Sequence, residues 1–122
     1  MDTDTLIATY EAAWQESNEQ ARLELLTNCW AENGIYQDPS GRAEGRDALS
    51  AHIAGFHKTY PGARIEVTSA VQSYDVNLRF NWHMRMADGT VAVGGVDFGQ
   101  IAPDGQLARI TGFFGDLTAV PG

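Results

Sequence analysis

The chain has 122 residues, enough for one domain spanning residues 1–122 and too few for two domains. Hydrophobic residues make up 43% of the chain and charged residues 20%, which is typical of a globular protein and not of a disordered one. The net charge is −8, and the few lysines and arginines form no cluster, so nucleic-acid binding is not expected.

Cysteine content and hydropathy exclude further classes. Cys29 is the single cysteine, so the chain can form neither an internal disulfide nor a cysteine-rich zinc site. It has no apolar run of about 18 residues and no basic N-terminal flank of a signal peptide. We therefore expect a cytoplasmic protein that does not contact membranes.

The first half of the chain is predicted to be helical. Residues 4–16 carry apolar side chains at the spacing of one buried stripe, Leu6, Ile7, Tyr10, Ala13 and Trp14. Ser17 and Gln20 fit a capping box, so a second helix should begin there and end at Gly34. A short strand over residues 35–38 then stops at Pro39, a glycine-containing loop follows, and residues 45–60 form a third helix.

The second half is predicted to be strands. Residues 63–74 alternate, and residues 77–86 alternate more clearly, with Phe80 and Trp82 on one face. Two Asp-Gly turns join residues 77–86, 90–101 and 107–115 into an antiparallel meander. The predicted fold class is α+β: a cone-shaped, curved antiparallel sheet, made of the short strand and a four-stranded meander, wraps around three N-terminal helices and encloses a cavity.

Two acids stand in apolar, strand-like surroundings. Asp97 shares its strand face with Gly95 and Gly99, which leave empty volume beside the carboxyl group for a ligand. A carboxylate removed from water either finds donors or raises its pKa until it is neutral. Asp97 could instead point outward to Arg79 or Arg85 across the hairpin.

Asp38 allows two interpretations as well. It follows the apolar pair Ile35 and Tyr36, and Pro39 comes directly after it. It could aim into the cavity, or it could be an ordinary turn-initiating aspartate whose side chain bonds a local backbone amide.

Three stretches of the chain carry a resemblance, and they are CWAENGIYQDPSG, GRDALSAHIAGFHKTYPGA and GVDFGQIAPDGQLARITGFFG. They resemble the nuclear-transport-factor-like superfamily, whose cone-shaped domains include ketosteroid isomerases, scytalone dehydratase and SnoaL-like polyketide cyclases. The resemblance covers essentially the whole chain and is not specific for one reaction.

Ketosteroid isomerase is the closest mechanistic comparison within that superfamily. The resemblance implies that Asp38 is the carboxylate base, that Asp97 is a protonated hydrogen-bond donor to an oxyanion, and that Phe114 is part of the cavity wall. Trp14 stands where those isomerases have a tyrosine donor, and it also fits a plain core aromatic on its helix. Tyr36 could supply the missing phenol from the strand of Asp38.

Other aromatic and histidine residues complete the predicted site. Phe56, Phe80, Trp82 and one of Phe113 or Phe114 are expected to form walls, and His57, near Phe56 and Tyr60, is a candidate ligand contact. The spacing of the three histidines fits no metal site, so we predict neither a metal nor another cofactor.

The expected partners are a small apolar molecule and a second copy of the chain. Val96 and Phe98 are apolar on the outer sheet face, where a solvated strand should be polar, and such residues commonly mark an interface. A homodimer through that face is therefore predicted.

Two hypotheses about function follow. The first is an isomerase- or cyclase-like enzyme that uses Asp38 as general base and Asp97 as hydrogen-bond donor or second acid. An epoxide-opening relay would need an Asp-Arg-Asp arrangement that the sequence does not place. The second hypothesis is a non-catalytic module of the same fold that binds a ligand or a protein partner.

Overall fold

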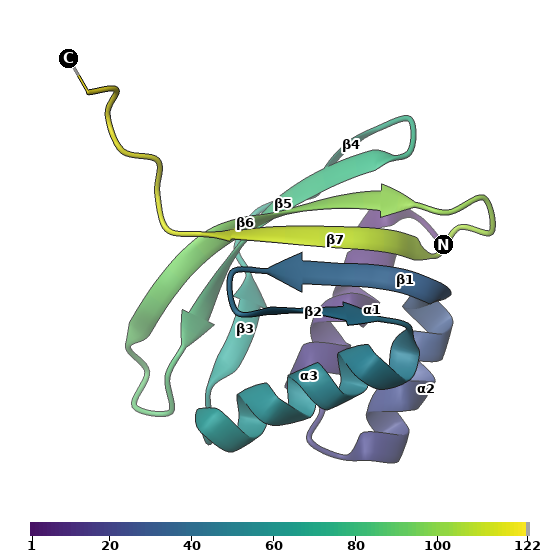
Figure 1. Cartoon of the computed structure of the whole chain (residues 1–122), viewed down its shortest axis with the longest axis horizontal. Helices are drawn as coiled ribbons and strands as arrows, with labels where there is room; N and C mark the ends of the chain where they lie inside the picture. The colour runs from purple at the N-terminus through teal and green to yellow at the C-terminus, as the bar shows by residue number, and fades with distance from the viewer. Residues whose placement is uncertain (122) are drawn as a thin grey trace.

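A computed structural model describes residues 1–121. The first half of the chain holds three helices, with two strands between the second and the third, and a curved sheet of seven strands that does not close on itself arches over them (Figure 1). The helices are α1 (Thr3–Gln15), α2 (Glu19–Cys29) and α3 (Arg46–Thr59). The strands are β1 (Trp30–Asp38), β2 (Gly41–Glu44), β3 (Arg64–Val67), β4 (Gln72–Tyr74), β5 (Asn77–Arg85), β6 (Val91–Ile101) and β7 (Leu107–Phe114).

The order of strands in the sheet is β2-β1-β7-β6-β5-β3, and β4 pairs with a second part of β5. The predicted antiparallel meander of β5, β6 and β7 is confirmed. The prediction of a wholly antiparallel sheet is wrong at one place, because β1 pairs with β7 in parallel. This long-range pairing puts the end of β1, which is far away in the sequence, next to the middle of β7, the outer strand of the meander.

Two boundaries in the first half differ from the prediction. The cap of α2 is Asn18 and not Ser17, since the Asn18 side chain accepts a hydrogen bond from the backbone of Ala21 at 2.9 Å. Gly34 does not end that helix but lies inside β1 against the Trp30 ring. A Cβ atom at position 34 would come within 2.6 Å of Trp30 Nε1, so only glycine fits there.

Two strands are absent from the prediction. Residues 41–44, expected as a loop, form β2 and pair with the end of β1. The stretch 63–74 breaks into β3 and β4, which both pair with β5, so the sheet has seven strands and not five.

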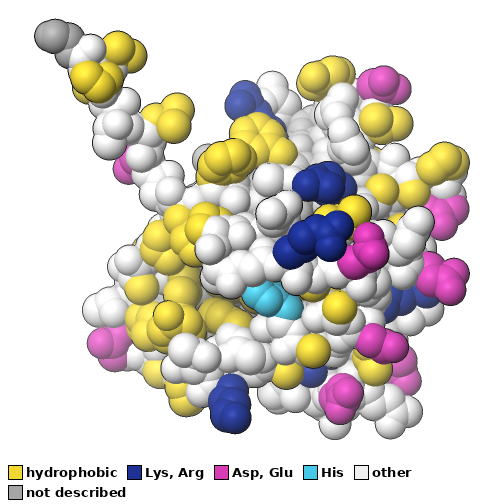
Figure 2. All heavy atoms as spheres, viewed as in Figure 1, with side chains coloured by type: hydrophobic (Ala, Val, Ile, Leu, Met, Phe, Trp, Pro, Cys, Tyr) yellow, Lys and Arg dark blue, Asp and Glu magenta, His cyan; other side chains and the backbone are white. Residues whose placement is uncertain are grey.

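The core lies between the helices and the concave face of the sheet. Phe80 and Trp82, which are predicted to share one face of β5, are buried, and so are Leu78 and Met84 on the same face. Hydrophobic side chains also gather on the surface where the bent end of the sheet faces α3 (Figure 2). Within residues 1–121, no helix has the length and apolar character needed to cross a membrane.

Candidate functional site

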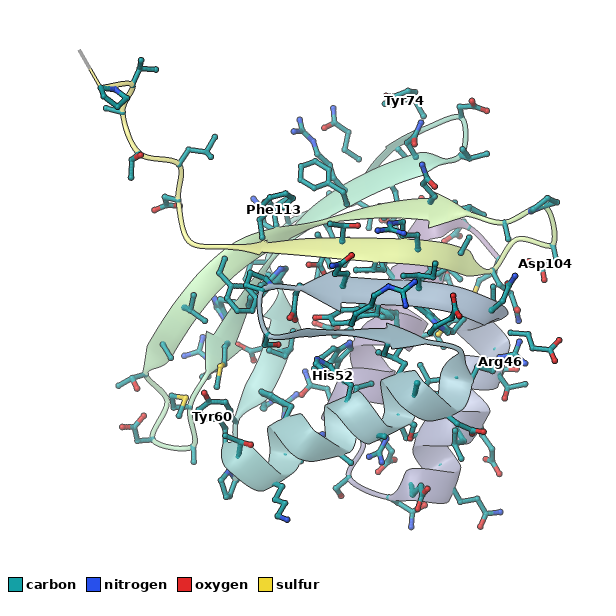
Figure 3. All side chains as sticks on the ribbon, viewed as in Figure 1. Arg46, His52, Tyr60, Tyr74, Asp104 and Phe113 are labelled. Carbon is teal, nitrogen blue, oxygen red and sulfur yellow. The ribbon has the colours of Figure 1, made fainter. Side chains whose placement is uncertain are left out.

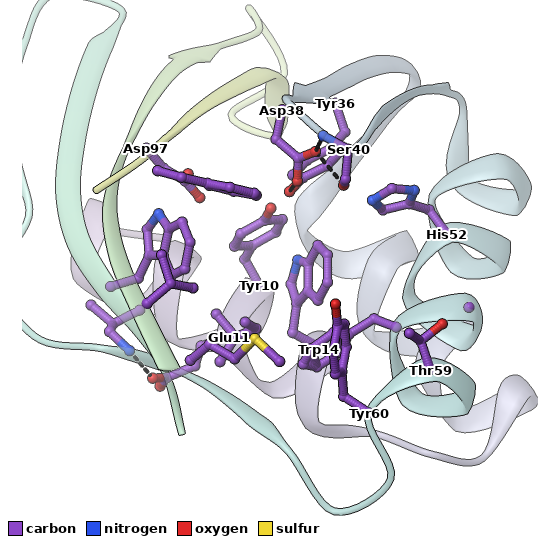
Figure 4. A pocket seen from close by; sticks show the side chains of 18 of the residues that line it. Tyr10, Glu11, Trp14, Tyr36, Asp38, Ser40, His52, Thr59, Tyr60 and Asp97 are labelled. Carbon is purple, nitrogen blue, oxygen red and sulfur yellow. Dashed lines mark hydrogen bonds between the residues drawn. The ribbon is translucent and has the colours of Figure 1, made fainter. Parts of the chain in front are cut away.

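A cavity of about 640 Å³ lies between the concave face of the sheet and helices α1 and α3 (Figure 4). It contains most of the residues predicted for the site. Its lining comprises Tyr10, Glu11, Trp14, Tyr36, Asp38, Ser40, His52, Gly55, Phe56, Thr59, Tyr60, Ile65, Val67, Phe80, Trp82, Met84, Val93, Asp97 and Phe114. Tyr60 and Phe114, each 44% exposed, lie where the cavity meets solvent.

Asp97 is the one buried acid among the described residues, with 7% of its surface exposed. On β6 it lies opposite Phe80 of β5 and Gly112 of β7. Burial raises the pKa of Asp97 to about 7, and the negative charge of Asp38 adds to the increase. Attraction to the Trp82 indole opposes the increase, although within residues 1–121 that N–H makes no hydrogen bond of ordinary geometry.

The alternative that Asp97 points outward to an arginine is wrong. Strand alternation puts Arg79 and Arg85 on the convex face, where they bond Gln72 and Glu66 at 2.6 and 2.8 Å. Asp97 faces the helices instead, so its carboxyl group shares the cavity with the aromatic walls.

Asp38 combines the two roles that the sequence left open. Its Oδ1 accepts hydrogen bonds from the Ser40 backbone at 2.7 Å and from the Ser40 hydroxyl at 2.5 Å, which is the turn arrangement. Its Oδ2 accepts a hydrogen bond from the Tyr36 hydroxyl on the cavity side (Figure 4). Asp38 therefore starts the turn after β1 and lines the cavity, where it acts as a hydrogen-bond acceptor.

Gly112 provides the space in which the two acids approach each other. A Cβ atom at position 112 would be 2.7 Å from Asp97 Oδ1 and 3.4 Å from Asp38 Cβ. β7 pairs with β6 on one side and with β1 on the other, so the parallel β1–β7 pairing brings Asp38 next to Asp97.

Trp14 is both a core residue and a cavity wall. It is 5% exposed, and its ring lies 5.6 Å from that of Tyr36, 5.7 Å from that of Phe56 and 6.0 Å from that of His52. The Tyr36 hydroxyl donates its hydrogen bond to Asp38, so it points to the acceptor carboxyl group of the site.

The structure does not place His57 in the cavity. His52 lines it in place of His57, because His52 lies one helical turn before Phe56 on the same face of α3 (Figures 3 and 4). His57 follows Phe56 directly and turns away. Its Nε2 is buried and has no hydrogen-bond partner in the part of the chain that the structure describes.

Tyr10, like His52, lines the cavity although the sequence does not predict it there. The helical period puts it in the buried stripe of α1, and the structure places it in the cavity lining one turn before Trp14. Its hydroxyl is buried and has no hydrogen-bond partner among residues 1–121. Burial raises the pKa of Tyr10 well above its usual range, and the charge of Asp97 adds to this effect, so Tyr10 is a neutral phenol. The spacing of four from Trp14 is the signal that could have identified it.

Phe114, and not Phe113, belongs to the cavity. The Phe114 ring meets Trp82 edge to face at 5.5 Å. Phe113 is 56% exposed and packs against Phe98 on the convex face, away from the helices (Figure 3).

The arrangement supplies the elements of acid–base chemistry. An acceptor carboxylate and a carboxyl group whose pKa lies near neutrality share an apolar cavity, together with an unpaired phenol. A carboxyl group that accepts hydrogen bonds suits a base, and a carboxyl group whose pKa lies near neutrality suits an acid. Within residues 1–121, no group of three or more histidine, cysteine, aspartate or glutamate residues is arranged to hold a metal ion.

A cone-shaped α+β fold with such a cavity defines the nuclear-transport-factor-like class of domains. Residues 7–110 match the profile of the SnoaL-like domain, and the chain therefore belongs to the SnoaL-like family. The comparison with curated proteins gave no match.

Solved structures agree with this assignment. A suggested isomerase of the SnoaL-like family from Agrobacterium tumefaciens is 30% identical, with a TM-score of 0.87 over 92% of this chain and 96% of that one. A suggested polyketide cyclase from Sinorhizobium meliloti is 16% identical, with a TM-score of 0.70 over 88% and 93% of the two chains. A protein of ketosteroid-isomerase-like fold from Catenulispora acidiphila, in complex with trimethylamine, is 14% identical, with a TM-score of 0.74 over 93% and 88%. The last two comparisons bear on the fold alone.

Proposed function

We propose that this protein is an isomerase- or cyclase-like enzyme that moves a proton next to the carbonyl group of a small, largely apolar substrate. The observation that carries the proposal is the pair of carboxyl groups on either side of Gly112. One accepts three hydrogen bonds at the cavity edge, and the other is buried with a pKa of about 7. Membership of the SnoaL-like family, which includes suggested isomerases and cyclases, supports the same reaction class.

Asp38 is the general base in this proposal. Its carboxylate takes a proton from the carbon next to the substrate carbonyl, and the electron pair of the broken C–H bond moves onto the carbonyl oxygen as an enolate. Return of the proton from Asp38 to the far carbon of a conjugated dienolate gives an isomer. Attack of the enolate carbon on a second carbonyl instead gives a ring, and the alkoxide formed there takes the proton back from Asp38. Neither route requires an oxidant or a reductant.

Asp97 and Tyr10 stabilise the enolate oxygen. A protonated Asp97 donates a hydrogen bond, and burial keeps a substantial fraction of it protonated near pH 7. The Tyr10 hydroxyl, which has no partner among the described residues, is free to donate a second one. This assigns to Tyr10 the tyrosine donor role that the resemblance places at position 14, while Trp14 holds the substrate by its ring.

The experiment begins with thermal-shift screening of steroidal ketones, polyketide-like aromatic esters and epoxides. A ketone that binds is then incubated with the enzyme in D₂O, and NMR follows deuterium entering the position next to the carbonyl. We expect exchange with the wild-type protein, and about 10²–10³-fold slower exchange with Asp97→Ala, which lacks the donor. Binding of ketones without any exchange would favour the non-catalytic module instead.

We also propose that two copies of the chain pair through the convex sheet face. Phe98 and Phe113, 41% and 56% exposed, meet edge to face there, and Val96 lies opposite Phe113 in the pairing of β6 with β7. Light scattering at micromolar concentration should give twice the chain mass of 13.3 kDa, and Phe98→Asp should give the single mass. A monomeric wild-type protein would contradict the dimer. The cytoplasmic location stays a prediction.

A further inference from the structure

The charge of the cavity lining is one-sided. Glu11, Asp38 and Asp97 contribute carboxyl groups to it, and among the described residues no lysine or arginine lines it. His52 is the one side chain of this lining that can carry a positive charge. An anionic ligand would meet carboxylates in an apolar cavity without a compensating cation, so the lining disfavours anions.

Glu11 extends the negative charge to a second side of the cavity. It comes from α1, and its Oε2 accepts a hydrogen bond from the Val67 backbone at 2.6 Å, at the edge of the sheet (Figure 4). Asp38 accepts its hydrogen bonds at the end of β1, on another side of the cavity. A ligand between α1 and β1 would therefore have acceptor carboxylates in more than one direction.

The walls and one unpaired atom favour a cation as well. Trp14, Phe80 and Trp82 line the cavity, and an aromatic ring can attract a positively charged group because it carries negative charge on its face. Tyr10 is 3% exposed, and its hydroxyl, directed into the cavity, has no partner within residues 1–121 (Figure 4). Its oxygen can accept a hydrogen bond from an ammonium group as well as donate one.

We infer that the cavity takes ligands that carry an amine cation, protonated or quaternary, on an apolar frame, and that it rejects anions of the same shape. This names a class of ligand for the site of the proposed function, and rests on that function for the site. Cation binding uses the charged form of Asp97, whereas the proposed reaction uses its protonated form, so binding and reaction have opposite pH dependences. It does not depend on proton transfer by Asp38. Recognition would come from the aromatic faces together with the carboxylates of Glu11 and Asp97.

Binding of a cation should depend on pH through Asp97. Since the pKa of Asp97 is about 7 in the empty cavity, a cation nearby favours its charged form and releases a proton. The groups around Asp97 that carry charge or protons are Asp38 of β1, Tyr10 and Glu11 of α1, and His52 of α3. A positive charge on His52 would also weaken cation binding. The contribution of Asp97 is therefore measured as the difference in the pH dependence of cation affinity between the wild-type protein and Asp97→Asn.

Three aryl methyl ketones of matched shape test the inference by calorimetry. They are (4-acetylphenyl)trimethylammonium, the neutral 4-tert-butylacetophenone and the anionic 4-acetylbenzenesulfonate. At pH 8.5 we expect the cation to bind about tenfold more tightly than its neutral isostere, and the sulfonate not to bind at millimolar concentration. Equal or tighter binding of the neutral ketone, binding of the sulfonate, or no binding of the cation would overturn the inference.

Substitutions locate the effect. Glu11→Gln should weaken binding of the cation several-fold and leave binding of the neutral ketone unchanged, whereas Glu24→Gln, the same change on the exposed face of α2, should alter neither.

The pH dependence tests the role of Asp97. Affinity for the cation should fall up to about 30-fold from pH 8.5 to pH 5.5 in the wild-type protein, and much less in Asp97→Asn. Equal effects of Glu11→Gln on both ketones, or the same pH dependence in Asp97→Asn, would contradict it. Cation preference without deuterium exchange would refute the proposed reaction and leave this inference standing. Deuterium exchange without cation preference would refute this inference and leave the proposed reaction standing.

Discussion

Asp38 and Asp88 begin turns that are nearly identical in their local hydrogen bonds. Asp38 Oδ1 accepts from the backbone and hydroxyl of Ser40, and Asp88 Oδ1 accepts from the backbone and hydroxyl of Thr90 at 2.9 and 2.7 Å. Both turns follow a strand of the same sheet. The local sequence therefore does not distinguish a site residue from a structural one.

The difference between the two turns lies in what surrounds them. Asp88 is exposed, and the hydrogen bonds from Thr90 lower its pKa. Asp38 uses its second oxygen to accept a hydrogen bond from Tyr36, and Gly112 separates it from Asp97. The aspartate of a common turn becomes a candidate base because the tertiary structure places a cavity and a second acid next to it.

The largest expected difference between the turns is in proton transfer. Asp38→Asn keeps an acceptor for the Ser40 amide but loses the base, so deuterium exchange of a bound ketone should slow by about 10²–10⁴-fold. Asp88→Asn keeps the equivalent bond to Thr90 and should exchange at the wild-type rate. The free energy of unfolding should change by similar, small amounts in the two variants. Similar exchange rates in both would show that Asp38 is only a turn residue.

Asp97 differs from the two turn aspartates because it is buried, and its burial predicts a dependence of stability on pH. Its pKa is about 7 in the folded protein and near 3.8 in the unfolded one, so the folded state binds more protons between these values. Its contribution to stability is therefore fully present below pH 4 and is lost as the pH rises to 7, by up to about 4 kcal/mol. Asp97→Asn should lack this component.

Urea unfolding of both proteins from pH 4 to 8 measures it. The difference in unfolding free energy between the wild-type protein and Asp97→Asn cancels the other titrating groups to first order. A difference that does not change with pH would mean that the Asp97 carboxyl group is not desolvated in the folded protein.

The space between the two acids is the next feature to test. Gly112→Ala puts a methyl group 2.7 Å from Asp97 Oδ1, which must shift, and we expect a loss of about 1–3 kcal/mol in unfolding free energy together with weaker ligand binding. Gly94→Ala is the matched change on β6, where the nearest atom would be 3.4 Å away. It should cost less and leave ligand binding unchanged. Equal losses in both variants would mean that the gap at Gly112 has no special role.

The sequence predicted the parts of this site that depend on strand period. Alternation along residues 90–101 puts Asp97 on the same face as two glycines, and the structure confirms that face. Periodicity does not predict which strands pair, so the parallel β1–β7 contact that joins Asp38 to Asp97 could not be derived from it. The resemblance to known isomerases put both acids in one site, but it did not supply that pairing.

The misses have local causes. His57 lies beside Phe56 in sequence, but a helix puts neighbours on different faces, and His52 is the residue that shares the face of Phe56. The sequence predicts Tyr10 only as a core residue, because a buried helical stripe does not reveal which of its members border a cavity. The first residues of β1 continue the apolar pattern of α2 through Trp30, so the helix-to-strand change has no signal in hydropathy.

The smallest expected effect concerns the one bond that Asp38 has and Asp88 lacks. Tyr36→Phe removes the hydroxyl that donates to Asp38 Oδ2, and the loss of a single hydrogen bond should lower the unfolding free energy by about 1 kcal/mol. Tyr74→Phe is the control, because Tyr74 is 74% exposed and its loss of a hydroxyl should have no effect on stability. If Asp38 is the base, Tyr36→Phe should also change the rate of exchange, since Tyr36 orients the carboxylate toward the substrate. Unchanged ligand affinity and exchange in Tyr36→Phe would remove Tyr36 from the site and leave Asp38 positioned by its turn alone, as Asp88 is.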